Sequence, residues 1–274
     1  MVNAAIFQMS IDLGQPVLNK QKIINCAERT EADLLVFPEC ANSGYAFSSR
    51  EEALAHAELI PGPFVDSLIT VARAKGCYLA VGILEKDGTE LRNTALLVTT
   101  EGEVHIYRKT HLPHLGADRF VTPGNQLPLF STGLGAVGLV ICYEWRFPEV
   151  ARCLALQGAD LLIGLSNWPR EAMATPTIML PARAVENHVW IISANRVGRE
   201  RDSDFIGRSM IIAPDGNAVA TLENSREGVV SADMDLSLSR KKHLIKKPKE
   251  YEIDLFRDRC PFLYRTIVRE TEHD

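Results

Sequence analysis

The sequence predicts a single α/β domain in which short apolar strands alternate with amphipathic helices. The first observation is a series of short apolar runs, such as 34–37 and 136–141, which are typical of buried strands. The second is a length of 274 residues with 46% hydrophobic residues, which is enough for one substantial core. The third is that no linker, repeat or low-complexity segment interrupts the pattern. We therefore expect one domain over 1–274, with a core at about 2–235 and an apolar tail, 236–274, that docks on the body or on a partner subunit.

Charge and composition exclude several function classes. A net charge of −5 argues against nucleic acid as the main partner. No apolar run has the length of a membrane span, and the N-terminus lacks the basic and apolar regions of a signal peptide. The six cysteines are scattered without a CxxC pair, which is typical of a reduced protein. We expect a cytoplasmic protein without membrane association.

The first half of the chain alternates strands with helices. Pro61-Gly62-Pro63 introduces a helix, and Asp87-Gly88 and Glu101-Gly102 are turn signals between strands. The long loop 110–127 predicts a functional segment, because connections of this length are uncommon inside compact domains. The expected strands are 2–8, 33–37, 77–83, 93–99 and 104–107, and the expected helices are 16–31, 50–58 and 63–76.

The second half repeats this alternation. Gly133, Gly135 and Gly138 match a dinucleotide-binding pattern by letter, but they precede a strand and therefore indicate a hairpin turn. The basic run 240–249 is interpreted as a solvated face. The expected strands are 136–141, 160–165, 189–193, 205–212, 217–222 and 228–232, with 205–212 pairing with 217–222, and the expected helices are 147–158 and 171–188.

Three chemically active side chains each follow a predicted strand: Glu39, Lys109 and Cys142. Taken singly, they suit a solvated loop carboxylate, a surface lysine and a buried structural cysteine. Strands that run the same way bring their ends to one sheet edge, where a carboxylate can take the thiol proton and a lysine can stabilise an oxyanion. Backbone N–H groups and Arg146 near Cys142 are expected to favour its thiolate.

A metal centre is not expected from the histidines. His105, His111 and His114 lack a regular ligand spacing, and no carboxylate or cysteine pair joins them.

Three segments, in this order, resemble the signatures of the nitrilase superfamily of carbon–nitrogen hydrolases. They are Phe-Pro-Glu39 with Ser-Gly-Tyr45, Tyr-Arg-Lys109-Thr-His-Leu, and Ile-Cys142-Tyr-Glu-Trp-Arg-Phe-Pro-Glu. The resemblance covers roughly 2–235. It implies a four-layer α-β-β-α sandwich of two mixed β-sheets and a homodimer or larger homo-oligomer. It implies Glu39 as general base, Cys142 as nucleophile and Lys109 with the Tyr143 N–H as oxyanion donors, without metal or organic cofactor.

The resemblance fails at one position. Many members carry a second glutamate before the Pro-Gly of the loop, whereas here the nearest carboxylate is Asp118, which is the possible second acid. The segment around Cys142 is closest to that of small-amide hydrolases such as omega-amidases. We therefore predict hydrolysis of a small carboxamide to carboxylic acid and ammonia. Nitrilase, N-carbamoyl hydrolase and a catalytically idle binding or redox-sensing protein remain as alternatives. The expected oxyanion and substrate-binding residues are Tyr143, Tyr45, Phe47, Glu144, Trp145 and Trp168.

Overall fold

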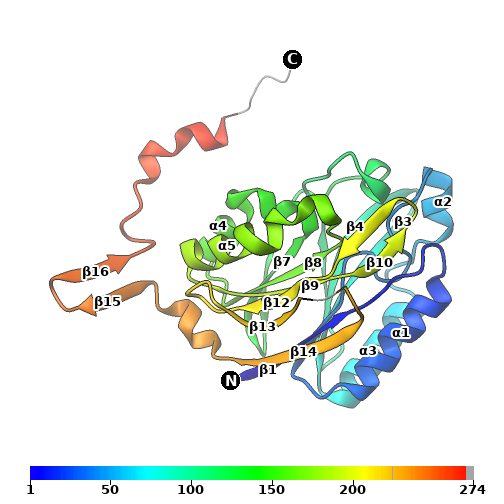
Figure 1. Cartoon of the computed structure of the whole chain (residues 1–274), viewed down its shortest axis with the longest axis horizontal. Coiled ribbons are helices and arrows are strands. Elements are labelled where there is room, and N and C mark those ends of the chain that lie inside the picture. Colours follow the sequence, from blue (N-terminus) through cyan, green and yellow to red (C-terminus); the bar gives the residue numbers. More distant parts are fainter. Residues whose placement is uncertain (224, 270–274) are drawn as a thin grey trace. The chain divides into compact units, whose positions relative to one another are not determined.

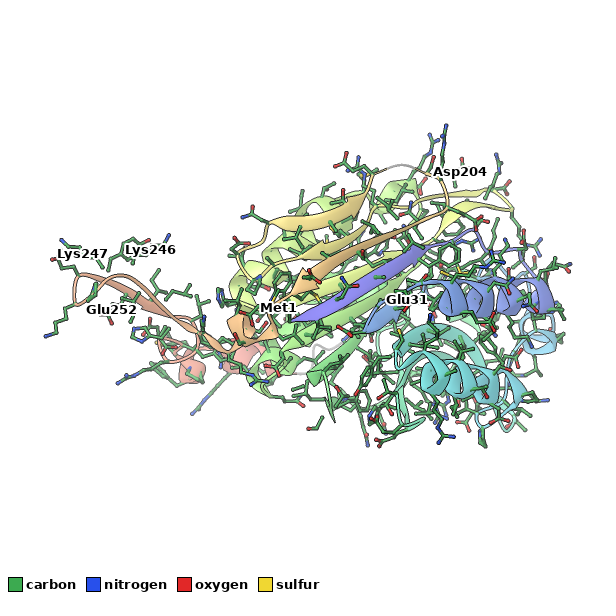
Figure 2. The ribbon with its side chains drawn as sticks, turned by 90° about the horizontal axis from the view of Figure 1, so that it is seen from below. Met1, Glu31, Asp204, Lys246, Lys247 and Glu252 are labelled. Atoms are coloured by element: carbon green, nitrogen blue, oxygen red, sulfur yellow. The ribbon has the colours of Figure 1, made fainter. Side chains whose placement is uncertain are left out.

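The apolar runs of the sequence form two six-stranded mixed sheets. The computed structural model describes residues 1–223 and 225–269. The first sheet has the order β14-β1-β2-β3-β4-β5, with β1, β2 and β3 parallel and the other neighbours antiparallel. Figure 2 shows β14 beside β1, so the last strand of this sheet lies against the first strand of the chain. The bounds are β1 Val2–Gln8, β2 Leu34–Val36, β3 Tyr78–Asp87, β4 Glu90–Val98, β5 Val104–Arg108 and β14 Gly228–Met234.

The second sheet has the order β13-β12-β9-β8-β7-β6, with β7, β8 and β9 parallel. The glycines 133 and 135 lie at the turn of the β6–β7 hairpin, as predicted. A separate two-stranded ribbon pairs β10 with β11. The bounds are β6 Leu129–Thr132, β7 Gly135–Ile141, β8 Leu161–Ser166, β9 Trp190–Asn195, β10 Val197–Glu200, β11 Ser203–Ile206, β12 Ser209–Ile212 and β13 Ala218–Leu222.

Helices cover the outer face of each sheet, which makes four layers (Figure 1). Side chains of both sheets, such as Ile6 and Leu139, share one buried core. Ile23 of α1 and Leu68 of α3 pack on the first sheet, and Leu154 of α4 packs on the second. The expected four-layer α-β-β-α sandwich is confirmed. The helices are α1 Pro16–Arg29, α2 Arg50–Ala55, α3 Pro63–Lys75, α4 Pro148–Leu156 and α5 Leu180–Asn187.

Two predicted elements are wrong in their extent. The expected helix 171–188 is divided into a 3₁₀ turn at Arg170–Ala172, a π turn at Thr175–Met179 and then α5. Its two prolines lack the N–H that continues an α-helix, and each lies in the first turn of one of the later pieces. The expected strand 205–212 is two strands, because Gly207 and Arg208 both have positive φ and end β11 before β12 begins.

The C-terminal residues from Lys241 onward form a unit distinct from Met1–Arg240. Much of the predicted basic face, 240–249, lies in the exposed hairpin of β15, His243–Lys247, and β16, Tyr251–Asp254. Short 3₁₀ turns follow at Pro261–Leu263 and Arg265–Val268. No helix in the described ranges is long and apolar enough to cross a membrane.

Candidate active site

Glu39 and Lys109 are brought together at one edge of the first sheet. Glu39 follows β2 and Lys109 follows β5, and these strands run in the same direction. The Lys109 ammonium donates a hydrogen bond of 2.7 Å to Glu39 Oε1, and both side chains are completely buried. The backbone at Glu39 lies so close to Gly82 of β3 that a Cβ there would be 2.5 Å from the Glu39 Cα. A larger residue than Gly82 would therefore displace the carboxylate.

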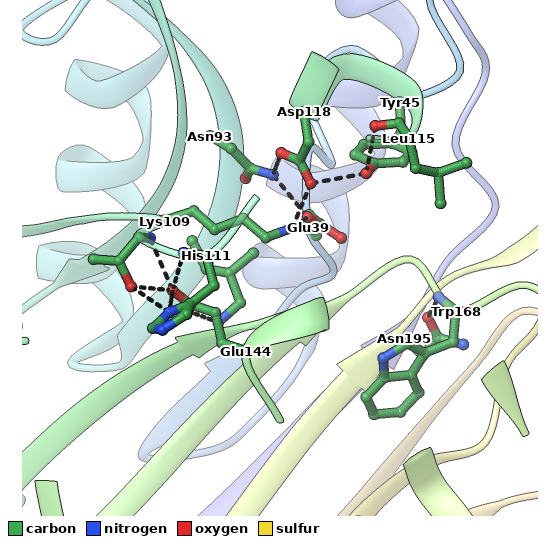
Figure 3. Close-up of polar contacts among 12 residues, drawn as sticks. Glu39, Tyr45, Asn93, Lys109, His111, Leu115, Asp118, Glu144, Trp168 and Asn195 are labelled. Atoms are coloured by element: carbon green, nitrogen blue, oxygen red, sulfur yellow. Dashed lines mark hydrogen bonds and ion pairs between the residues drawn. The ribbon is translucent and has the colours of Figure 1, made fainter. Parts of the chain in front are cut away.

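Asp118 joins this pair from the long loop. It lies in the 3₁₀ turn η1, Gly116–Arg119, and accepts a hydrogen bond of 2.6 Å from Lys109 Nζ. The Tyr45 hydroxyl donates to the same carboxylate oxygen at 2.8 Å, as Figure 3 shows. The loop predicted to be functional thus delivers a carboxylate to the lysine, at the position where the resemblance left a second acid open.

Asn93 is a member of the cluster that the sequence did not indicate. Its Nδ2 donates to Glu39 Oε1 at 2.7 Å and to Asp118 Oδ1 at 2.8 Å, so one amide connects both carboxylates (Figure 3). Its backbone carbonyl accepts from Lys109 N at 2.9 Å. Because β4 is antiparallel to β3 and β5, its N-terminal half lies at the edge where β5 ends. The direction of this strand was the only signal that could have indicated Asn93 from the sequence.

The cluster places two carboxylates beside one ammonium, and all three side chains are completely buried. Burial raises the pKa of Glu39, Lys109 lowers it in part, and the charge of Asp118 raises it further. Burial by itself would lower the pKa of Lys109, but the two carboxylates raise it well above its ordinary value. Lys109 is therefore a permanent cation, and Glu39 binds a proton more readily than an ordinary glutamate does.

Cys142 lies at a sharp elbow between β7 and a 3₁₀ turn, Cys142–Arg146. Its φ of +48° is in the left-handed region, a strained conformation that often marks functional sites when a residue is not glycine. Burial raises the pKa of the thiol well above its ordinary value, Glu39 adds to this, and Lys109 and the Asn167 backbone N–H oppose it. The expected help from backbone N–H groups is present at Asn167, but burial and Glu39 act against the thiolate, and Arg146 is exposed.

Glu144 was expected to contact substrate, but its carboxylate is bonded within the protein. Its carboxylate is completely buried and accepts from the Ile141 N–H at 2.7 Å, the Thr110 N–H at 2.8 Å and the Tyr107 hydroxyl at 2.5 Å. These bonds tie the elbow to the segment that follows Lys109 (Figure 3). The expectation that Glu144 contacts substrate is corrected to a positioning role for the two segments that carry Cys142 and Lys109.

Two adjoining cavities open beside the elbow. The inner cavity, of about 250 Å³, is lined by Cys142 together with three of the expected residues, Tyr45, Tyr143 and Trp168. The outer cavity, of about 620 Å³, is lined by Phe47 and shares Tyr45 with the inner one. Trp145 lines neither, because it packs beneath the elbow on Gly164, where a Cβ would be 2.9 Å from the indole. Its expected role as a pocket wall is therefore wrong.

His105 and His111, which the sequence raised as possible metal ligands, each stack on an aromatic side chain. His105 stacks on Phe130, and His111 stacks on Phe147. Across residues 1–223 and 225–269, no group of three or more histidine, cysteine or acidic side chains could hold a metal ion.

Comparison with known proteins gives a consistent result. The family model described as carbon-nitrogen hydrolase matches residues 3–246. A nitrilase of Pyrococcus abyssi is 38% identical over 249 residues, which cover 89% of this chain and 94% of that protein. An omega-amidase of Xenopus tropicalis is 33% identical over 235 residues, which cover 78% of this chain and 81% of that protein.

A solved structure extends the similarity to the whole fold. The amidase of Nesterenkonia sp. AN1 has a TM-score of 0.81 and 28% identity, and the match covers 98% of this chain and 100% of that one. In a variant of that amidase, acrylamide is added to the active-site cysteine. Both the sequence match and the four-layer architecture lead to one conclusion: this chain belongs to the carbon–nitrogen hydrolase family, in the nitrilase superfamily.

Proposed function

We propose that this protein hydrolyses a small carboxamide to a carboxylic acid and ammonia through a thioester on Cys142. The observation that carries the proposal is the buried Glu39–Lys109 pair beside the strained Cys142 elbow. Both charges reach the thiol strongly enough to shift its pKa. A base and a cation near a nucleophile that lines a cavity are the groups that acyl transfer requires.

The first half of the reaction forms the thioester. Glu39 Oε2 has no hydrogen-bond partner among the described residues, so this oxygen is available to the thiol proton. As Glu39 takes that proton, the Cys142 sulfur bonds to the carbonyl carbon of the substrate. Lys109 and the Tyr143 N–H are the proposed donors to the oxyanion that develops. Glu39 then returns its proton to the nitrogen, the C–N bond breaks, and ammonia leaves.

The second half releases the acid. A water molecule gives one proton to Glu39 as its oxygen bonds to the thioester carbon. The C–S bond breaks, the proton returns to sulfur, and Cys142 is a thiol again. Glu39 thus accepts and returns one proton in each half, first from the thiol and then from water, and its raised pKa suits this, because a base that must also act as an acid works best with a pKa near the working pH.

The size of the inner cavity supports a small substrate. A volume of about 250 Å³, walled by Tyr45, Trp168 and Leu115, has room for a compact acyl chain but not for a peptide. The relatives include an omega-amidase and a nitrilase, and the solved neighbour is an amidase. We favour the amide because amide attack generates an oxyanion directly, and the Lys109 ammonium is the cation that we propose as its donor.

Ammonia release from matched substrates tests this function. Propionamide should yield stoichiometric ammonia and propionate, and propionitrile should react at least about tenfold more slowly, a difference of about 1.4 kcal/mol in barrier. The Cys142→Ala variant is the control and should release none. A faster nitrile, or release of carbon dioxide from carbamoyl compounds with no reaction of simple amides, would contradict the proposal.

The predicted homo-oligomer also remains a proposal. Ile178 of the π turn and Val185 of α5 are 65% and 48% exposed and belong to the helical segments after Cys142 that the resemblance places at an interface. The C-terminal unit carries further exposed apolar side chains, including Phe262 and Val268. We propose that a partner subunit covers both sets. Light scattering on the eluting protein should give at least twice the mass of one chain, and a monomer would contradict the proposal.

A further inference from the structure

Asn167 is a buried asparagine whose side chain finds no partner. Only 2% of the residue is exposed, and neither Oδ1 nor Nδ2 has a hydrogen-bond partner among residues 1–223 and 225–269. Burying a polar amide without a partner costs stability, so such a side chain is rarely retained for packing alone.

Other buried asparagines of this chain show the contrast. Asn19 accepts from the Asp12 N–H and donates to the Asp12 carbonyl. Asn42 accepts from the Leu84 N–H, and Asn195 uses both its oxygen and its nitrogen. Each of these side chains holds two segments of backbone together. Asn167 holds none, so its side chain has no structural role in the described protein.

The place of Asn167 connects it with the reaction. It follows β8, the strand next to β7, and its backbone N–H reaches the Cys142 sulfur. It lines both the inner and the outer cavity. The next residue is fixed, because the Trp168 N–H donates to Asn195 Oδ1 at 2.7 Å. The indole N–H of Trp168, on the same wall, is also without a partner among the described residues.

The reacting amide itself does not need Asn167. In the proposed mechanism the amide oxygen faces Lys109 and the Tyr143 N–H and the amide nitrogen faces Glu39, so the Asn167 side chain has no part in the reacting group. Figure 3 shows Trp168 and Asn195 well apart from the cluster of Lys109, Glu39 and Asp118. A group that meets Asn167 must therefore lie on the acyl part of the substrate. Because the backbone N–H of Asn167 reaches the sulfur, we place that group on the first or second carbon beyond the carbonyl.

We propose that Asn167 binds a hydrogen-bonding oxygen on the acyl chain, so that the preferred substrates are short carboxamides with a hydroxyl or oxo group one or two carbons from the reacting carbonyl. The inference rests on the proposed amidase function and specifies its substrate class. Nδ2 donates to that oxygen, and Oδ1 accepts when the group is a hydroxyl. A purely apolar acyl chain leaves both amide atoms buried without partners and is disfavoured.

Two matched pairs of amides test the proposal: lactamide against isobutyramide, and 3-hydroxypropionamide against butyramide. In each pair a hydroxyl replaces a methyl group at one carbon. The wild-type enzyme should prefer the hydroxyl member of at least one pair by tenfold or more in kcat/KM, which is in the range that a site built for a hydroxyl achieves. In Asn167→Leu, which keeps the branched shape of the side chain and removes both polar atoms, that ratio should fall to within about threefold of unity.

Thr175→Val is the matched control, because Thr175 is a buried hydroxyl residue on the same cavity wall. This variant should keep the wild-type ratio. A ratio lost in Thr175→Val and kept in Asn167→Leu would overturn the assignment. Equal rates within both pairs in the wild-type enzyme would by themselves overturn the proposed role of Asn167. This result would leave the amidase function intact. Release of ammonia from none of the four amides would refute the amidase function as well.

Discussion

The Lys109 ammonium donates a hydrogen bond of 2.6 Å to the Asp118 carboxylate, and both side chains are completely buried. Asp118 also accepts from Tyr45 and Asn93, so three donors fix its position. The shorter aspartate reaches the lysine because the η1 turn carries its backbone into the cluster. Asp118 and Glu39 thus both hold the Lys109 ammonium, and we propose that Asp118 is the second acid, which orients Lys109.

Replacing Asp118 by asparagine should lower turnover by at least about tenfold, because one N–H···O bond to a charged group is exchanged for a weaker one and Lys109 loses its orientation. The unfolding midpoint should change little, since the isosteric amide removes a negative charge from a cluster with one carboxylate in excess. Steady-state kinetics and a thermal melt measure the two effects. Tyr45→Phe, which removes one donor to Asp118, should have a smaller effect on turnover. Unchanged turnover in Asp118→Asn would show that Lys109 is oriented without it.

The raised pKa of Glu39 predicts the pH dependence. As the general base, Glu39 must be ionised in the free enzyme, so kcat/KM should fall on the acid side with an apparent pKa above the ordinary glutamate value of about 4.3. The apparent pKa of this acid limb describes the coupled cluster of Glu39, Lys109 and Asp118 as a whole. An acid limb at or below the ordinary value would contradict the assignment.

The same shift has a consequence for stability. A carboxyl whose folded pKa is raised costs stability at pH values above its unfolded pKa, because the folded protein then holds a charge that it disfavours. Glu39→Gln should therefore abolish turnover and leave the thermal midpoint at neutral pH equal or higher. At pH 4, below the ordinary pKa, the difference in midpoint should disappear. A clear loss of stability at neutral pH would show that the Glu39–Lys109 pair holds the fold together.

Glu144 should show the opposite behaviour. Burial by itself would raise its pKa, but the hydrogen bonds that it accepts hold the pKa below the ordinary value. It therefore contributes stability above the unfolded pKa, and this contribution is lost as the pH falls through the folded pKa. Glu144→Gln should cost about 1–3 kcal/mol of unfolding free energy at neutral pH in a denaturant titration. If Glu144→Gln kept full stability but had a raised KM, this result would support the contact between Glu144 and substrate that the sequence indicated.

Much of the site could be predicted because its members follow strands. Glu39 and Lys109 each come directly after an apolar run, and parallel direction alone brings their ends together. The four layers were predicted only through the resemblance to the nitrilase superfamily, and the two sets of apolar runs do share a core. The interruptions of the predicted strand 205–212 and helix 171–188 could not be predicted. The split at Gly207 and the π turn at Thr175 depend on how neighbouring strands and helices pack.

The remaining residues depend on contacts that no local pattern encodes. Asn93 is one polar residue in a strand, and its role follows from the two carboxylates on either side of it. Glu144 is close to Cys142 in sequence, yet the elbow directs its carboxylate to Thr110 and away from the cavities. The state of the Cys142 thiol is set by burial, which outweighs the cations that the sequence places nearby.

Mass spectrometry of the acyl-enzyme is the most direct test of the account. The protein is mixed with propionamide, quenched in acid within the first turnovers and digested, and the peptide that contains Cys142 is examined. The thioester mechanism predicts one propionyl group on Cys142, absent from Cys142→Ala and from Glu39→Gln, with ammonia released in equal amount during the first turnover. Ammonia release without any acyl adduct, or an adduct on Cys40 or Cys153 while Cys142→Ala stays active, would contradict the thioester mechanism.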